Sequence, residues 1–449
     1  MIYIKTWILF LRVILRYCLF SESYDKYYLS GKKLFSLTFR YPEKSKHSFG
    51  FFFKAYLKAI FSGKVKLEYA CHIYAKGDIF FYDNDSSIAN EKARISHIEY
   101  FLKAPVSGSI WKDKLSGYFT FTDRIFQLIF ETLLFLFLLP MALFAKYRGS
   151  VALIFTEYIE LVNLLKIVKR ENVNELYYYS IYEKDSNITS IALQSICIKV
   201  NKITSSTPLK FWNSIIVATD TLILCDTNQQ DELDELKETI QVENVEIWGP
   251  ETIAGSAIYY TEENKYNTNK NIIGFYSTSS YLRVLQGDLD QKNMKKNEDT
   301  VKSYLAEYLK THPDSRLIIF PHPREKKEEM RNDMIAHYEF FFHGLNYSIY
   351  ESTSASSLCF DMTDLGVAMY SSVIYERLYF GFKSLMMPFG EQGMELPGKA
   401  LNYICAIDKT DFFSKIDMFL NFSVLEYFEK TGLKRSPFME NVLSKAKAK

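Results

Sequence analysis

The chain of 449 residues lacks the short motifs that mark several large enzyme classes. It has no G-x-x-x-x-G-K-[ST] phosphate loop, no H-E-x-x-H helix, no G-x-S-x-G nucleophile turn, and no D-x-D pair at a strand end with supporting ligands. These absences disfavour a P-loop ATPase, a zinc hydrolase and a serine hydrolase. No metal-binding cluster is visible in the sequence, and we expect no bound cofactor.

Cysteine and excess charge are also scarce. The six cysteines form no C-x-x-C pair, which favours buried reduced thiols over a disulfide framework or a zinc site. The formal net charge of +1 argues against a nucleic-acid partner held by bulk positive charge. With 48% hydrophobic and 24% charged residues, the chain can bury a large core over two or three domains.

The first twenty residues predict a helix that lies at a membrane surface. They are apolar except for Thr6 and three cations, Lys5, Arg12 and Arg16. On a helix these cations share one narrow stripe, which leaves a wide apolar face. Such a helix suits an interface, with its cations near anionic headgroups. The alternative is a helix packed on the protein with its cations in water.

Residues 125–145 form a second apolar segment. It contains Gln127 and Glu131 and is interrupted by Pro140, so it is marginal as a spanning helix. We expect a helix that dips into the membrane or covers the core. Together the two segments predict peripheral attachment to the inner, cytoplasmic face of the plasma membrane. Residues 21–120 show no firm pattern.

From residue 151 onward, strand and helix patterns alternate, which indicates an α/β fold with parallel sheets. The polar residues 261–271 are a linker candidate between two Rossmann-like halves facing a cleft, where ligands usually bind. We expect residues 1–148 to hold the membrane-associating helices, residues 149–268 to form the acceptor-side half, and residues 269–449 to form the donor-side half. Expected strands are 176–182, 215–218, 221–225, 245–248, 272–276, 317–320, 347–350, 367–370, 384–388 and 403–407. Expected helices include 226–239, 299–310, 324–338, 373–380 and 411–422.

His322 follows the expected strand 317–320 and lies between Pro321 and Pro323. Because a residue before proline favours extended backbone, the imidazole would project stiffly from the strand end. It can donate a hydrogen bond to a phosphate oxygen and, when protonated, offset charge on a departing phosphate. Arg324 can assist it. The alternative is a turn histidine with a local hydrogen bond.

Ser371 and Ser372 lie between the expected strand 367–370 and the helix that follows. Hydroxyls and free amides at a helix start suit an anion, although serine is also a common N-cap. Glu376, one turn into this helix, can accept hydrogen bonds from ribose hydroxyls. Since open α/β sheets bind ligands at the carboxyl ends of their strands, these positions predict a site for a nucleotide.

The segment 277–283 follows the first strand of the same half, and we expect it to be a loop. Its hydroxyls, including Ser279, and Arg283 can also meet phosphates. A polar surface loop is the alternative.

A nucleotide site of this kind suggests a transferase that uses an activated donor. Transfer to a hydroxyl acceptor needs a base, which should come from the other half. Glu183 and Asp185 follow the expected strand 176–182, which makes them the candidates. Asp83 and Asp85, in an acidic turn, are a weaker option. For either pair the alternative is a solvated acidic loop.

The residues Phe320-Pro321-His322-Pro323, together with the run Tyr370-Ser371-Ser372-Val373-Ile374-Tyr375-Glu376 and Gly381, resemble the C-terminal half of GT-B glycosyltransferases. They are most similar to bacterial sialyltransferases and Kdo-type transferases of lipooligosaccharide and capsule synthesis, over roughly residues 270–410. The resemblance implies that His322, Ser371 and Ser372 contact the CMP portion of the donor, with an acidic base in the N-terminal half and no metal. That group usually shows an acidic-acidic-Gly motif, whereas this chain has Glu183-Lys184-Asp185-Ser186.

The sequence thus predicts a metal-independent GT-B glycosyltransferase. It would move a sugar from a nucleotide-activated donor, CMP-sugar favoured, to a surface polysaccharide or lipid-linked glycan, with inversion. UDP- and GDP-sugar enzymes share the Ser-Ser-x-x-x-Glu pattern. The alternatives are a CDP-glycerol-type polyol-phosphate transferase and a non-catalytic nucleotide-binding scaffold at the membrane.

Overall fold

The structure is a computed structural model of the chain. It describes residues 24–29, 32–38, 73–76, 88–104, 106–108, 121–143, 172–179, 196–204, 217–235, 240–260, 271–352, 354–369, 371–388 and 399–447, with the single residues 4, 8, 53, 57, 162, 165, 168, 190, 193 and 194. The chain divides into two compact units. The second unit comprises Ile247–Lys449 together with Ser205–Phe211 and Leu224–Glu235, and the first unit comprises the rest.

The first unit is built on a six-stranded mixed sheet with strand order β4-β3-β5-β6-β7-β8. Its strands are β3 (Ile73–Lys76), β4 (Val106–Gly108), β5 (Glu175–Tyr178), β6 (Lys199–Ile203), β7 (Val217–Leu224) and β8 (Ile240–Ile247). The strands β5, β6 and β7 run parallel, as the alternating pattern predicted. By contrast, β3 is antiparallel to both β4 and β5.

Several strands of this sheet differ from expectation. The strand β8 begins at Ile240, five residues before the expected strand 245–248, and β3 and β4 were not predicted. The expected strands 215–218 and 221–225 form one strand, β7, because Asp220 does not break it. Its carboxylate instead accepts a hydrogen bond from the Val200 amide of β6 at 2.7 Å. The strand β6 itself has no strong sequence signal, since it reads KVNKI and buries Lys202.

The first unit also contains a hairpin and two long helices. The hairpin is β1 (Tyr24–Leu29) with β2 (Lys32–Thr38), and the helices are α3 (Ile88–Leu102) and α5 (Phe121–Leu143). The helix α5 coincides with most of the second apolar segment and continues through Pro140. In the part of the chain that is described, no helix is both long and apolar enough to cross a membrane. Most of residues 1–20 lie outside the described residues; Ile4 and Ile8 are helical and exposed.

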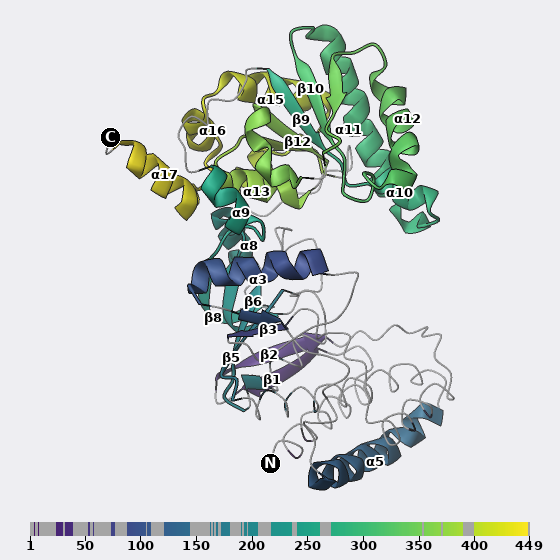
Figure 1. The fold of residues 1–449 in the computed structure, drawn as a ribbon, viewed down its shortest axis with the longest axis vertical. Coiled ribbons are helices and arrows are strands. Elements are labelled where there is room, and N and C mark those ends of the chain that lie inside the picture. Colours follow the sequence, from purple (N-terminus) through teal and green to yellow (C-terminus); the bar gives the residue numbers. More distant parts are fainter. Residues whose placement is uncertain are drawn as a thin grey trace. The chain divides into compact units, whose positions relative to one another are not determined.

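The second unit is built on a five-stranded parallel sheet with order β11-β10-β9-β12-β13 (Figure 1). Its strands are β9 (Ile272–Tyr276), β10 (Arg316–Phe320), β11 (Tyr347–Ile349), β12 (Leu365–Ala368) and β13 (Ser384–Met386). The order runs outward from β9 in both directions, so the topology switches sides between β9 and β12. The α/β class predicted from the sequence is therefore confirmed.

Helices cover both faces of this sheet, with α11 and α12 on one side and α13 and α15 on the other (Figure 1). The helices of the unit are α8 (Gln230–Glu235), α9 (Ile253–Tyr259), α10 (Ser280–Leu285), α11 (Lys292–Thr311), α12 (Arg331–Phe342), α13 (Ser372–Phe380), α14 (Lys399–Tyr403), α15 (Lys409–Asn421), α16 (Val424–Thr431) and α17 (Pro437–Lys447). The described residues of the unit also include five three-residue 3-10 turns: Thr227–Gln229, Leu289–Gln291, Glu328–Met330, Ser356–Leu358 and Phe360–Met362. The strands β9, β10, β12 and β13 are buried along almost their whole length because both faces are covered, whereas the edge strand β11 is half-buried.

Several expectations for this unit need correction. The segment 277–283 is a loop only as far as Ser279, because Ser280–Leu285 forms α10 and buries Tyr281 and Leu282. The expected strand 403–407 makes a single bridge, from Cys405 to Met386. The expected helix 324–338 begins only at Arg331, and residues 226–239 divide into a 3-10 turn and α8.

Candidate functional site

Three of the sequence-predicted elements lie at the carboxyl ends of adjacent strands. Phe275 of β9 pairs with Ile319 of β10 on one side and with Val367 of β12 on the other. Ser277, Pro321 and Met369 therefore each lie two residues beyond paired positions. The sheet thus brings together the segments that carry Ser279, His322 and the Ser371-Ser372 pair, at the point where its topology switches sides.

The loop after β9 is fixed by hydrogen bonds to a buried carboxylate of α11. Glu298 has no exposed surface and accepts hydrogen bonds from the Thr278 amide at 2.6 Å and the Ser280 amide at 3.3 Å. The Ser280 hydroxyl also donates to it. The Ser277 hydroxyl bonds Glu298 at 3.3 Å and Glu325 at 3.0 Å. The backbone of this loop is therefore held in one conformation before any ligand arrives.

Ser279 is the strained residue of this loop. Its φ of 59° is in the left-handed region, which a non-glycine residue adopts at a cost of roughly 1–3 kcal/mol. Its side chain is buried, and its hydroxyl has no hydrogen-bond partner among the described residues. The Thr278 hydroxyl and the Arg283 Nε are likewise buried and unpartnered there. Unsatisfied buried donors are costly, so these groups point to a ligand that accepts hydrogen bonds.

His322 begins a tight turn after β10. Its amide donates to Glu325 at 2.6 Å, and the Glu325 amide donates back to the His322 carbonyl at 2.8 Å. The Arg324 amide approaches the His322 Nδ1 at 3.2 Å. Since Nδ1 accepts this bond, geometry assigns the proton of the neutral ring to Nε2, which leaves Nε2–H as a donor.

Two guanidinium groups and, with a smaller opposing effect, the Glu298 carboxylate act on the charge of His322. Burial, followed by the nearby guanidinium groups of Arg324 and Arg283, lowers the pKa of His322 from 6.5 to about 4. The ring is therefore neutral at pH 7 in the free protein. It acts as a hydrogen-bond donor beside two cations rather than as a third charge. This arrangement suits an anion, which would offset the repulsion among these groups.

Glu325 and Glu298 were missed by the sequence analysis. Burial, with the neighbouring Glu298 carboxylate, raises the pKa of Glu325 to about 7. The Tyr338 hydroxyl donates to Glu325 at 3.2 Å. A signal for Glu298 was present in the sequence, because it shares a helical stripe with Val301, Leu305 and Leu309, all buried. A carboxylate on an apolar stripe is unusual enough to flag.

Ser371 is the N-cap of α13. Its side chain accepts a hydrogen bond from the Val373 amide at 3.4 Å, and Ser372 is the first helical residue. Both side chains are partly exposed. Capping therefore occupies one acceptor of Ser371, while its hydroxyl proton and the Ser372 hydroxyl remain suited to an anion at the helix start.

Glu376 lies one turn further into α13 and is partly buried. The Thr252 hydroxyl donates to its Oε2 at 3.2 Å. Burial, with a smaller contribution from Glu251, raises the pKa of Glu376 to about 7, against the opposing effect of the Thr252 hydrogen bond. The carboxylate retains acceptor capacity beyond this one bond.

The candidate bases Glu183 and Asp185 lie outside the described residues, as do Asp83 and Asp85. At the carboxyl end of β5, the described residues contain a buried pair of side chains that the sequence analysis missed. Tyr179, just after β5, is bonded to Nδ1 of His97 on α3, and its hydroxyl lies 3.3 Å from the Arg94 carbonyl. His97 has no exposed surface.

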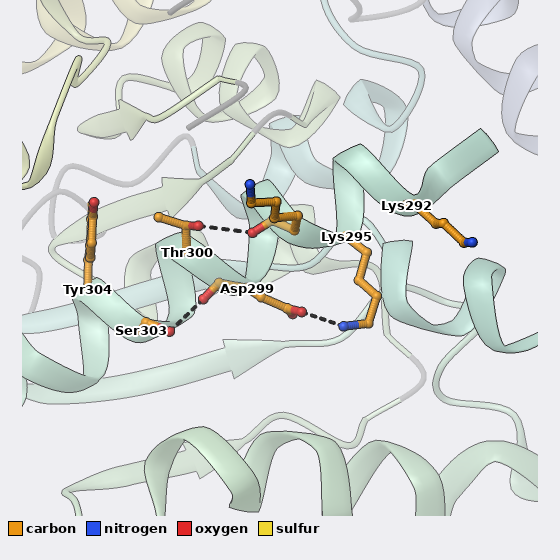
Figure 2. A pocket seen from close by; sticks show the side chains of 7 residues that line it. Lys292, Lys295, Asp299, Thr300, Ser303 and Tyr304 are labelled. Atoms are coloured by element: carbon orange, nitrogen blue, oxygen red, sulfur yellow. Dashed lines mark hydrogen bonds and ion pairs between the residues drawn. The ribbon is translucent and has the colours of Figure 1, made fainter. Parts of the chain in front are cut away.

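An open hollow of about 560 Å³ lies along α11 (Figure 2). It is lined by Lys292, Lys295, Lys296, Asp299, Thr300, Ser303 and Tyr304. Lys295 bonds Asp299 at 2.5 Å, and the hydroxyls of Thr300 and Ser303 bond carbonyls of their own helix. None of the sequence-predicted residues lines this hollow. Within the described residues, no group of three His, Cys, Asp or Glu side chains is placed to hold a metal ion.

No family model matches the chain, and no curated protein does. Similar solved structures include the UDP-GlcNAc 2-epimerase from Neisseria meningitidis bound to UDP-GlcNAc, at 11% identity and TM-score 0.41, covering 65% of this chain and 79% of that chain. MurG from Acinetobacter baumannii matches at 11% identity and TM-score 0.37, covering 64% and 77%. A glycosyltransferase from Rickettsia africae matches at 12% and 0.35, covering 64% and 78%. TM-scores this low support no inference about this chain, so the α/β fold class rests on the observed sheet topology.

Proposed function

We propose that the protein is a GT-B glycosyltransferase that moves a sugar from a nucleotide-activated donor to a surface polysaccharide or lipid-linked glycan. A CMP-sugar is the favoured donor, because the His-Pro and Ser-Ser motifs resemble those of the sialyl and Kdo-type transferases. The donor's phosphate binds at the carboxyl edge of β10, β9 and β12. The protein works without a metal ion or other cofactor.

One observation carries this proposal. Hydrogen-bond donors without acceptors gather at the switch point of a parallel sheet: the Ser279 and Thr278 hydroxyls and the Arg283 Nε, with the Nε2–H of His322 beside them. An anion with several oxygen acceptors satisfies such donors, and a sugar-nucleotide phosphate is an anion of that kind. Ser372, the first residue of α13, the helix that follows β12, adds a further hydroxyl donor.

The chemistry follows from charge. As the glycosidic C–O bond breaks, negative charge develops on the leaving phosphate, and the donors around it stabilise that charge more than they stabilise the ground state. An acidic residue of the first unit, Glu183 or Asp185, takes the proton of the acceptor hydroxyl as that oxygen bonds the anomeric carbon. Direct displacement with one base inverts this carbon. The enzyme works at the inner face of the plasma membrane, where lipid-linked acceptors are assembled.

Nucleotide binding by the purified protein tests the proposal. We expect CMP to raise the melting temperature, because a ligand of the folded state stabilises it, and we expect His322→Ala to abolish most of the shift. The matched control is His343→Ala, which removes a highly exposed histidine of the same unit. A shift with UDP or GDP would keep the site and change the donor. No shift with any nucleotide, in a folded sample, would overturn the proposal.

Transfer itself is tested by mass spectrometry of acceptor glycans from cells that express the wild type, His322→Ala, or Glu183→Gln with Asp185→Asn. Nucleotide binding without transfer in the wild type would favour the non-catalytic scaffold. Release of CMP from CDP-glycerol, but not from a CMP-sugar, would favour the polyol-phosphate transferase.

A further inference from the structure

Helix α5 buries two polar side chains and exposes large apolar ones. Two polar side chains beyond its first turn, Gln127 and Glu131, are buried. Gln127 donates to Glu131 at 2.7 Å, and Glu131 is 2% exposed. The buried side also contains Leu134, Phe135 and Leu138. A helix on the surface of a water-soluble unit normally shows the opposite arrangement, with its polar residues outward.

The outward face of α5 is apolar. Its large exposed side chains are Ile125, Phe126, Leu128, Ile129, Leu133, Leu136 and Phe137. At 3.6 residues per turn these positions cover about half of the helix circumference, and Pro140 lies within the same sector. Among the described residues, half of the exposed large hydrophobic side chains lie in the first 143 residues, and most of those belong to α5. An exposed apolar face this continuous marks an interaction surface.

We infer that this face of α5 lies in the plane of a membrane, with its apolar side chains among the lipid acyl chains. Three features favour lipid over a protein partner. No charged side chain belongs to the exposed described positions from 125 to 140, whereas a protein interface needs a polar rim and hydrogen bonds. Glu131, the one carboxylate of the segment, is hidden from the acyl chains by its bond to Gln127.

The third feature is the charge that flanks the helix in the sequence. Arg124, next to Asp123, precedes the apolar run, and Lys146 and Arg148 follow it. Cations at both ends of an apolar helix favour the headgroup region of a bilayer, where anionic lipids attract them. Because α5 keeps a buried polar side, it lies along the surface instead of crossing it. This inference does not depend on sugar transfer, and it identifies which surface would bring the chain to a lipid-linked acceptor.

Vesicle flotation tests the inference with the full chain. Vesicles of phosphatidylglycerol and phosphatidylcholine should carry the wild type, and binding should persist at high salt because apolar burial is not screened. The double variant Leu133→Gln, Leu136→Gln should partition roughly a hundredfold more weakly, since two exposed leucines lose their burial in lipid. The matched control is Leu285→Gln with Ile407→Gln, which changes two exposed apolar residues of the second unit. The control should float like the wild type.

A second measurement tests the depth of insertion. A Leu133→Trp variant should gain fluorescence quenching by brominated lipids relative to the wild type, whereas Leu285→Trp should not. Flotation of the Gln double variant at wild-type levels, or equal quenching of both Trp variants, would overturn the inference. So would a wild type that ignores vesicles and forms dimers that the double variant loses, which would make the occupant a second copy. Nucleotide-induced thermal shifts should be the same in all these variants, so failure here is distinct from failure of the proposed function.

Discussion

His322 and Glu325 close a tight turn through two reciprocal hydrogen bonds. The His322 amide donates to the Glu325 carboxylate at 2.6 Å, and the Glu325 amide donates to the His322 carbonyl at 2.8 Å. The side chain proposed to meet the phosphate is therefore positioned by a buried acid three residues later. The pKa of His322 is lowered and the pKa of Glu325 is raised, so the two groups contribute with opposite sign to the pH dependence of stability.

The first prediction concerns stability and pH. The pKa of Glu325 is raised from 4.5 to about 7, so the folded state holds the extra proton and the free energy of unfolding falls as pH rises through that window. The pKa of His322 is lowered from 6.5 to about 4, so the unfolded state holds the extra proton and the free energy of unfolding rises between those values. In the overlap, between about pH 4.5 and 6.5, the two contributions oppose each other.

A variant that removes one of these two groups should show the effect of the other group alone on the pH dependence of stability. Compared with the wild type, Glu325→Gln should gain stability with rising pH, and His322→Ala should lose it, each by up to about 1.4 kcal/mol per pH unit. Urea unfolding from pH 4.5 to 6.5 measures these slopes. The double variant should return to nearly the wild-type slope. Parallel curves for both single variants would contradict the assignment.

The second prediction separates two adjacent serines. Ser371→Ala should lower the unfolding free energy by about 1 kcal/mol because it removes the N-cap of α13. Ser372→Ala keeps the cap, so its stability should be close to that of the wild type while its nucleotide affinity falls about tenfold or more. Thermal melts and titration calorimetry make the comparison. Equal loss of stability in both variants would assign Ser372 a structural role only.

The third prediction concerns Glu376 and the pH dependence of binding. A ribose hydroxyl is bound best by the ionised carboxylate, and the pKa of Glu376 is about 7 in the free protein. Nucleotide affinity should therefore rise from pH 6 to 7.5 and then level off. Glu376→Gln should remove this rise while it keeps an acceptor for the Thr252 hydroxyl. An unchanged pH profile in Glu376→Gln would exclude contact with the ribose.

The fourth prediction concerns Arg377, a buried arginine of α13. Arg377 has no exposed surface, and its guanidinium donates to the Tyr276 hydroxyl at 2.9 Å, the Thr363 hydroxyl at 3.0 Å and the Lys383 carbonyl at 3.0 Å. It passes so close to Gly366 of β12 that an added Cβ would lie 2.2 Å from its Nε. Gly366→Ala should therefore destabilise the protein by about 1–3 kcal/mol or more through overpacking.

The matched control for Gly366→Ala is Gly255→Ala. Gly255 lies within α9, where an added Cβ meets nothing within 4 Å. Alanine there should leave stability unchanged or raise it by roughly 0.5–1 kcal/mol, since glycine is a poor helix former. Chemical denaturation of both variants decides the matter. A well-tolerated Gly366→Ala would mean that Arg377 can move away.

Local sequence patterns predicted much of the second unit. The run Ile272–Tyr276 is β9 with the expected bounds, and Arg316–Phe320 extends the expected strand by one residue, because both are short apolar runs bounded by polar residues. The polar positions at the strand ends were likewise visible as breaks in those runs. The first unit was harder, since β6 carries two lysines and α5 shows an apolar pattern without a clear outer face.

The sequence by itself determined most strands of the second unit, the helices that follow them at 299–310, 373–380 and 411–422 to within a few residues, and the polar residues at the strand ends. These properties depend on neighbours along the chain. Only the tertiary structure decided that β9 lies between β10 and β12, which brings the segments of Ser279, His322 and Ser371 to one edge. It also decided that Glu298 and Glu325 are buried together and that α5 turns Gln127 and Glu131 inward. Periodicity records that a face is buried but not what covers it, because sheet order and packing partners arise from contacts between residues far apart in the chain.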